Sequence, residues 1–189
     1  MPLTVAVGAV TAAQATTIGK MLVADGQAYA YIRIMWEMNG NWFPWGIDGG
    51  SLGYSAATYV SVFRTAVDAF RAVPGNHFQI VWNVNGSSSV PTAAYPGSAY
   101  VNDIGVDQYD YSGYPSNMNA IIAFAKSQGK PLQVDEWGVM GHNDPTYVNT
   151  MASFMNSADD ISLQVYFDNG SNVLTDYPAA LSAYEADFG

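Results

Sequence analysis

The sequence predicts an α/β fold in which about six βα units build a TIM-type (β/α) barrel. Short apolar segments rich in β-branched residues alternate along the chain with segments whose apolar residues recur at helical spacing. The apolar segments are nearly continuous, as expected for parallel strands that are covered on both faces. Polar and aromatic residues gather where these segments end, which favours a barrel over a doubly wound open sheet.

The first half of the chain supplies three strands and two helices. The expected strands cover residues 3–10, 28–36 and 78–83. A helix over residues 11–24 separates the first two strands. A second apolar stripe at helical spacing spans residues 59–73 and stops at Pro74-Gly75, a pair that ends helices.

The second half repeats this alternation. The expected strands cover residues 101–107, 132–137 and 161–167. Apolar residues at 121–125 predict a helix that ends at Gly129. Asp144-Pro145 is typical of an N-cap followed by proline at the first helical position, and residues 178–188 form the last helix.

Composition limits the classes of function. A chain of 189 residues fits one domain, residues 1–189, and its net charge of −10 opposes binding to nucleic acid and to anionic membranes. No apolar run approaches the roughly 20 residues that cross a bilayer. The chain has no cysteine, two histidines and no Gly-rich phosphate loop, so we expect no metal and no cofactor. No signal peptide follows Met1, although a secreted protein could have lost one.

The carboxyl ends of the predicted strands carry residues with carboxylate, amide or aromatic side chains. They read WEMNGNW, WNVNG, DQYDYSGY, DEWGVMGHND and YFDNGSN. The opposite ends, such as Gly129-Lys130-Pro131, are plain turns. Because barrel enzymes build their sites from the carboxyl ends of strands, this asymmetry predicts an active site there.

Only three glutamates occur in the chain, and two of them end predicted strands. Glu37 and Glu136 both stand beside tryptophan, whereas Glu185 lies in the last helix. Burying a carboxylate beside tryptophan costs free energy unless the carboxylate has an ion-pair partner or a functional role. The plainer alternative is that each glutamate forms a salt bridge with a neighbour such as Arg33.

Two facing carboxyls beside aromatic rings are what glycoside hydrolysis requires. One must donate a proton to the leaving oxygen while the other attacks the anomeric carbon or activates water. A retaining enzyme needs a spacing of about 5 Å and an inverting enzyme a wider one. The sequence does not decide between the two spacings.

Five stretches, in order, resemble glycoside hydrolase family 26 and its bacterial relatives in clan A. They are RIMWEMNGNWFPWG, WNVNG, YPGSAYVNDIGVDQYD, GKPLQVDEWG and QVYFDN. The resemblance implies a retaining β-glycosidase on a (β/α) barrel, with Glu37 as acid/base, Glu136 as nucleophile and Tyr109 touching the nucleophile. It also implies a polysaccharide substrate, β-1,4-mannan first and β-glucan next, and a secreted bacterial protein.

The sequence departs from the family pattern in two ways. Family 26 mannanases usually have histidine before the acid/base residue, where this chain has Trp36, which weakens the expectation of mannan. Counting strands against the family makes the first strand here the third of the barrel, so the first two βα units are missing. We therefore expect either a gap in the barrel wall or a homodimer that covers the open sheet edges.

Aromatic rings and amides near the strand ends are the expected substrate contacts. They are Trp36, Asn39, Trp42, Trp45, Trp82, Asn83, Tyr109, Trp137 and Tyr166. Buried tryptophan and turn asparagine are common, so core or turn roles are the alternative for each. Two other functions stay open: a barrel relic that binds glycan without hydrolysing it, and an interaction domain that assembles through its open edges.

Overall fold

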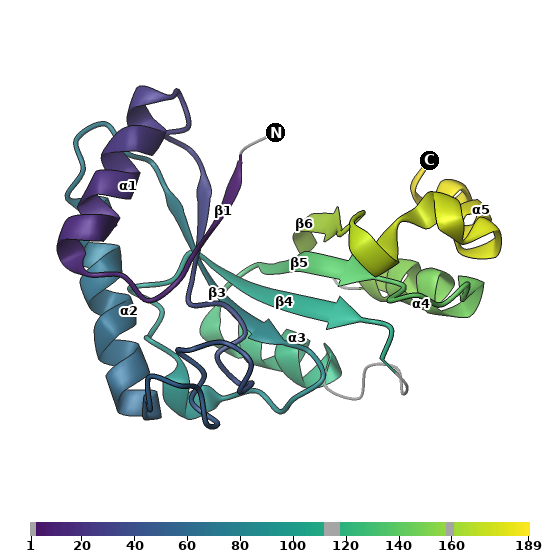
Figure 1. Cartoon of the computed structure of the whole chain (residues 1–189), viewed down its shortest axis with the longest axis horizontal. Helices are drawn as coiled ribbons and strands as arrows, with labels where there is room; N and C mark the ends of the chain where they lie inside the picture. Colours follow the sequence, from purple (N-terminus) through teal and green to yellow (C-terminus); the bar gives the residue numbers. More distant parts are fainter. Residues whose placement is uncertain (1–2, 112–117, 158–160) are drawn as a thin grey trace.

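The computed structural model describes residues 3–111, 118–157 and 161–189. One parallel sheet runs in the order β1-β2-β3-β4-β5-β6. Its strands are β1 (Thr4–Val7), β2 (Tyr31–Ile34), β3 (Gln79–Asn85), β4 (Asp103–Tyr109), β5 (Leu132–Gly138) and β6 (Ile161–Tyr166). The sheet curls and carries its helices on the outside, so the fold is an incomplete TIM-type barrel (Figure 1). The predicted fold class is confirmed.

In the described part of the chain five of the six strands are each followed by an α-helix, whereas a 3₁₀ helix (Thr92–Ala94) lies between β3 and β4. The α-helices are α1 (Ala12–Ala24), α2 (Ala56–Arg71), α3 (Met118–Gln128), α4 (Pro145–Ser157) and α5 (Pro178–Phe188). Thr11 and Gln14 form a reciprocal capping box at the start of α1. The Asp144 carboxylate accepts the backbone N–H groups of Thr146 (2.8 Å) and Tyr147 (3.1 Å), which confirms the predicted cap of α4.

The second strand is shorter than predicted. It ends at Ile34 rather than at Trp36. Met35 (φ 46°) and Glu37 (φ 52°) adopt the left-handed backbone conformation, which breaks the strand geometry. Apolar composition alone does not reveal such a change in backbone direction.

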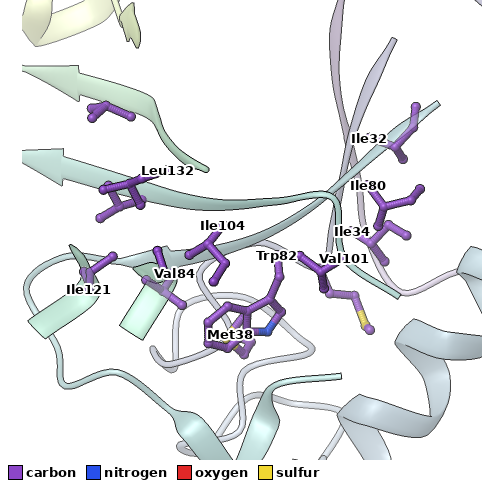
Figure 2. Close-up of a cluster of buried hydrophobic side chains, with 14 of the residues drawn as sticks. Ile32, Ile34, Met38, Ile80, Trp82, Val84, Val101, Ile104, Ile121 and Leu132 are labelled. Atoms are coloured by element: carbon purple, nitrogen blue, oxygen red, sulfur yellow. The ribbon is translucent and has the colours of Figure 1, made fainter. Parts of the chain in front are cut away.

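The outer face of the sheet forms the apolar core with the helices. Figure 2 shows part of this cluster, in which strand residues meet α3 and the loop residues Met38 and Val101. Its labelled strand and helix members are Ile32, Ile34, Ile80, Trp82, Val84, Ile104, Leu132 and Ile121. Alternate residues of the same strands therefore face the inside of the curl.

The inner face carries a buried polar layer. The Asn83 side chain donates to Asp107 (3.0 Å) and to Asp135 (3.1 Å), and the Arg33 guanidinium donates to the Asn83 oxygen (2.8 Å). Glycine is needed at position 105, because a Cβ there would collide with the Asp135 carboxylate. The layer joins β2, β3, β4 and β5 beneath their carboxyl ends.

The two edges of the sheet are open in the described part of the chain. There β1 pairs with β2 alone and β6 with β5 alone, so the barrel wall has a gap. The expected gap is confirmed, whereas the homodimer and the single domain over residues 1–189 stay predictions. Among the described helices, none combines the length and the apolar character that a membrane crossing needs.

Burial of Asp135 makes the stability of the fold depend on pH. Desolvation, the largest cause, raises the pKa of Asp135 from 3.8 to about 6, so the folded state holds this proton where the unfolded state has lost it. As pH rises from about 4 to 6, the free energy of unfolding should fall by about 3 kcal/mol through this group. We expect Asp135→Asn to flatten that fall in urea titrations. A matched Asp68→Asn variant on the exposed side of α2 should leave it unchanged; equal slopes in both variants would contradict the prediction.

Candidate active site

A cavity of about 510 Å³ opens at the carboxyl ends of the strands. Both strand-end glutamates line it. The other lining residues are Trp36, Trp42, Phe43, Asn85, Ser87, Ser88, Tyr109 and Tyr111. The structure thus brings together, in one hollow, two carboxyl groups and several aromatic rings.

Glu37 is held by neutral hydrogen-bond donors. Its backbone N–H donates to the Asn83 carbonyl (3.0 Å), which fixes the turn after β2. The Trp42 indole N–H donates to Oε2 (2.7 Å), and the Asn85 amide donates to Oε1 (2.7 Å). Burial raises the pKa of Glu37, the Asn85 and Trp42 bonds oppose the shift, and the charge of Glu136 adds to it.

Glu136 has the opposite surroundings. The Arg33 guanidinium donates to Oε1 and the Tyr109 hydroxyl donates to Oε2, both at 2.6 Å. Burial and the neighbouring Glu136 carboxylate raise the pKa of Tyr109, so the phenol keeps the proton that it donates. The predicted contact between Tyr109 and Glu136 is confirmed. Glu136 thus accepts one hydrogen bond from a full positive charge and one from a fixed hydroxyl.

The salt-bridge alternative holds for one glutamate of the pair. Glu136 forms an ion pair with Arg33, which also contacts Asp107 (2.5 Å) and lies 3.7 Å from Asp135. Glu37 has no ion-pair partner among the described residues. The two carboxyls therefore differ in charge environment although they share one cavity.

Several expected substrate contacts lie elsewhere. Trp45 is buried, donates its indole N–H to the Trp36 carbonyl (2.8 Å) and stacks on Phe43, so it supports the loop from below. Trp82 is fully buried and packs against Tyr95 and Phe124 on the outer face of the sheet. These two tryptophans are core residues, because both belong to the buried hydrophobic cluster.

The other expected substrate contacts that lie outside the cavity also have their polar groups or rings in contact with protein. Trp137 is buried against Tyr166 and donates to the side chain of Gln164 (2.8 Å). The Tyr166 hydroxyl donates to the Asn172 carbonyl (2.9 Å). Asn83 belongs to the polar layer. None of these residues, nor Asn39, lines the cavity, whereas Trp36, Trp42 and Tyr109 do.

The sequence reasoning missed several residues of the site. Asn85, Phe43, Tyr111, Ser87 and Ser88 all line the cavity. The ending WNVNG contained the signal for Asn85, since alternate residues of a strand share a face and Asn85 stands two residues after Asn83. Among the residues that the structure describes, no group of three or more histidines and carboxylates could hold a metal ion.

Gly40 lets the Trp42 ring reach Glu37. A Cβ at position 40 would collide with the six-membered part of the indole. We expect Gly40→Ala to break the bond between Trp42 and Glu37 and to move the Trp42 indole N–H signal upfield in NMR spectra. Trp42→Phe assigns that signal among the five tryptophans. Because Trp42 is 52% exposed, the thermal midpoint should change little, and an unmoved signal would contradict the prediction.

Comparisons with known proteins find one matching family and two curated relatives. The model of the family described as "Glycosyl hydrolase family 26" matches residues 19–164. The chain is 27% identical over 191 residues to Endoglucanase H of Acetivibrio thermocellus, covering 89% of this chain and 21% of that protein. It is 30% identical over 144 residues to a mannan endo-1,4-beta-mannosidase of Bifidobacterium adolescentis, covering 67% and 14% of the two chains.

Solved structures show the same fold. A modular endo-β-1,4-mannanase of Cellulomonas fimi superposes with a TM-score of 0.69 at 21% identity, over 91% of this chain and 45% of that chain. The chain therefore spans about a fifth or less of these curated relatives and somewhat under half of that solved chain.

Proposed function

Because the chain belongs to glycosyl hydrolase family 26, we propose that it acts as a retaining glycosidase on a β-1,4-linked polysaccharide, with Glu37 as acid/base and Glu136 as nucleophile. Two carboxyls in one cavity with opposite surroundings are the observation that supports this function most. An acid that must start protonated and a nucleophile that must start ionised need environments that separate their pKa values.

In the first step, the Glu136 carboxylate attacks the anomeric carbon and Glu37 transfers its proton to the departing glycosidic oxygen. The bond to the leaving sugar breaks and a glycosyl ester forms on Glu136. In the second step, the ionised Glu37 takes a proton from water, which attacks the same carbon and frees Glu136. The Arg33 and Tyr109 donors are placed to stabilise the carboxylate as it is released.

Mannan is the first candidate substrate and β-glucan the second. A relative at 30% identity carries the name of a mannan endo-1,4-beta-mannosidase, and one at 27% that of an endoglucanase. Because Trp36 stands where family 26 mannanases usually have histidine, β-glucan is kept as the second candidate substrate. The exposed Trp42 ring beside Glu37 offers an aromatic surface for a sugar ring.

Release of reducing sugar from mannan and from mixed-linkage β-glucan tests the proposal. The Glu136→Ala variant is the control, and release above that control supports the glycosidase. Glycan binding without such release would favour the second candidate, a non-catalytic glycan-binding relic. That candidate is favoured by the gap in the barrel wall beside the two open edges.

The pH profile of turnover should be bell-shaped. Its acid limb reports ionisation of the nucleophile, and its alkaline limb reports loss of the proton from Glu37. Because burial raises the pKa of Glu37, the alkaline limb should lie above the usual range of a glutamate. Initial rates on a soluble glycan from about pH 4 to 8 check this, and a flat profile would contradict the paired-carboxyl mechanism.

A further inference from the structure

Four hydrogen bonds join the turn that carries Glu37 to the end of β3. The Glu37 backbone N–H donates to the Asn83 carbonyl at 3.0 Å. The Asn39 side-chain amide bonds to both backbone groups of Asn85, donating to its carbonyl and accepting from its N–H, each at 2.9 Å. The Asn85 side chain then donates to Oε1 of Glu37 at 2.7 Å.

The orientation of the Asn85 amide is fixed by its neighbours. Its Oδ1 accepts the backbone N–H of Ser87 at 2.9 Å, and a backbone N–H can only donate. The nitrogen of the amide must therefore face Glu37. Asn85 is 5% exposed, and its amide has at most one N–H left for a ligand.

The two donors to Glu37 differ in how readily they can leave it. Trp42 is 52% exposed, so its indole N–H can turn to water or to a bound sugar hydroxyl. The buried Asn85 amide has no such alternative, and an unsatisfied buried donor is costly. A carboxyl oxygen that carries a proton is a poor acceptor, so the proton belongs on the oxygen whose donor can be released.

We infer that Asn85, clamped by Asn39, is a positioning residue that holds Oε1 of Glu37 as an acceptor and leaves Oε2, on the Trp42 side, as the oxygen that takes and gives the proton. The catalytic role of that proton rests on the proposed function, whereas the assignment of the proton to Oε2 of Glu37 does not. Other charged or titratable groups also face Glu37: Arg33 from β2, Asp107 and Tyr109 from β4, Glu136 from β5, and Tyr111 from the loop after β4.

NMR of the carboxyl carbons tests this without any turnover. The chain has three glutamates, so protein labelled with ¹³C at the glutamate carboxyl gives three signals, assigned with Glu37→Gln and Glu136→Gln. We expect Asn85→Ala to move the titration midpoint of Glu37 upward, because a donor to the ionised form is lost. Asn39→Ala should give a smaller shift in the same direction.

A matched amide at the other end of β3 provides the control. The Asn102 side chain accepts the backbone N–H of Ile80 at 2.9 Å, so Asn102→Ala removes a comparable structural bond far from Glu37. It should leave the Glu37 midpoint in place. An unmoved midpoint in folded Asn85→Ala would overturn the inference. If that variant does not fold, the isosteric Asn85→Asp variant replaces it in the test. Two neighbouring carboxyls that share a proton should then raise the Glu37 titration midpoint above its wild-type value.

The proton's location has its own readout. As wild-type protein is acidified, the Trp42 indole N–H signal should move with the Glu37 midpoint, because Oε2 stops accepting. The Asn85 side-chain N–H signals should move much less. The reverse pattern would overturn the assignment of Oε2. Absence of hydrolysis together with these shifts would refute the glycosidase and leave the inference standing, so the two failures are distinguishable.

Discussion

Glu37→Ala is expected to lower kcat/KM on an unactivated polysaccharide by about 10³-fold, and to lower it far less on an aryl β-glycoside with an acidic phenol as leaving group. A sugar alkoxide cannot depart without a proton, whereas a nitrophenolate can. Rates on both substrates, compared with wild type, measure this difference directly. Added azide should restore turnover of the aryl glycoside in this variant and give the β-glycosyl azide, because azide needs no general base.

Glu136→Ala is the partner of that experiment. It removes the proposed nucleophile, so activity on both substrates should fall together, by a factor on the order of 10⁴ or more. Glu185→Ala changes the third glutamate, in α5, and should behave like wild type. Equal losses on both substrates in Glu37→Ala would contradict its role as the acid, and unchanged activity in Glu136→Ala would remove the nucleophile from the scheme.

Arg33→Met should cost about 3–5 kcal/mol of unfolding free energy, a large share of the total for a domain. This guanidinium is 4% exposed and is the cation that faces Asp107, Asp135 and Glu136. Without it, buried carboxylates are left uncompensated. Urea denaturation at pH 8 measures the loss.

The loss should shrink at pH 5, where protonation relieves the repulsion. Asp135, whose pKa burial raises to about 6, takes up its proton in that interval. Arg64→Met is the matched control, since Arg64 is exposed and bonds to the Pro96 carbonyl (2.9 Å) beside the Tyr100 ring. It should cost under about 1 kcal/mol at either pH. Equal costs for the two arginines would contradict the central role of Arg33.

The alternation of strands and helices was predictable because it depends on local patterns. Apolar periodicity located each element, and Asp144-Pro145 and Pro74-Gly75 marked helix boundaries that the structure bears out. The end of β2 was not predictable in this way. Its backbone turns at the left-handed residues Met35 and Glu37, and the apolar Met35 and Trp36 look in the sequence like a continuing strand.

The site was predictable in its carboxyls and less so in its aromatic rings. Glu37 and Glu136 stood out because glutamate is rare in this chain and both stand at the carboxyl ends of predicted strands. Trp42 and Trp45 stand three residues apart in one loop, yet one ring is 52% exposed at the cavity and the other is 8% exposed beneath it. Trp45 packs against Trp36 and Phe43 and bonds to the Trp36 carbonyl, whereas Trp42 does not, and no pattern in the sequence encodes those contacts.

The left-handed backbone at Glu37 has an evolutionary consequence. At φ 52° a residue with a Cβ is strained by about 1–2 kcal/mol relative to glycine. A buried carboxyl adds desolvation to that strain. In Glu37→Gly, water entering from the cavity can take the place of the carboxylate as acceptor for the Asn85 amide, so the variant should be inactive and unfold at a higher temperature. A lineage that had stopped using this position would gain stability by discarding the glutamate. Its presence here is the thermodynamically unfavourable choice, and continued selection for proton transfer is what would maintain it.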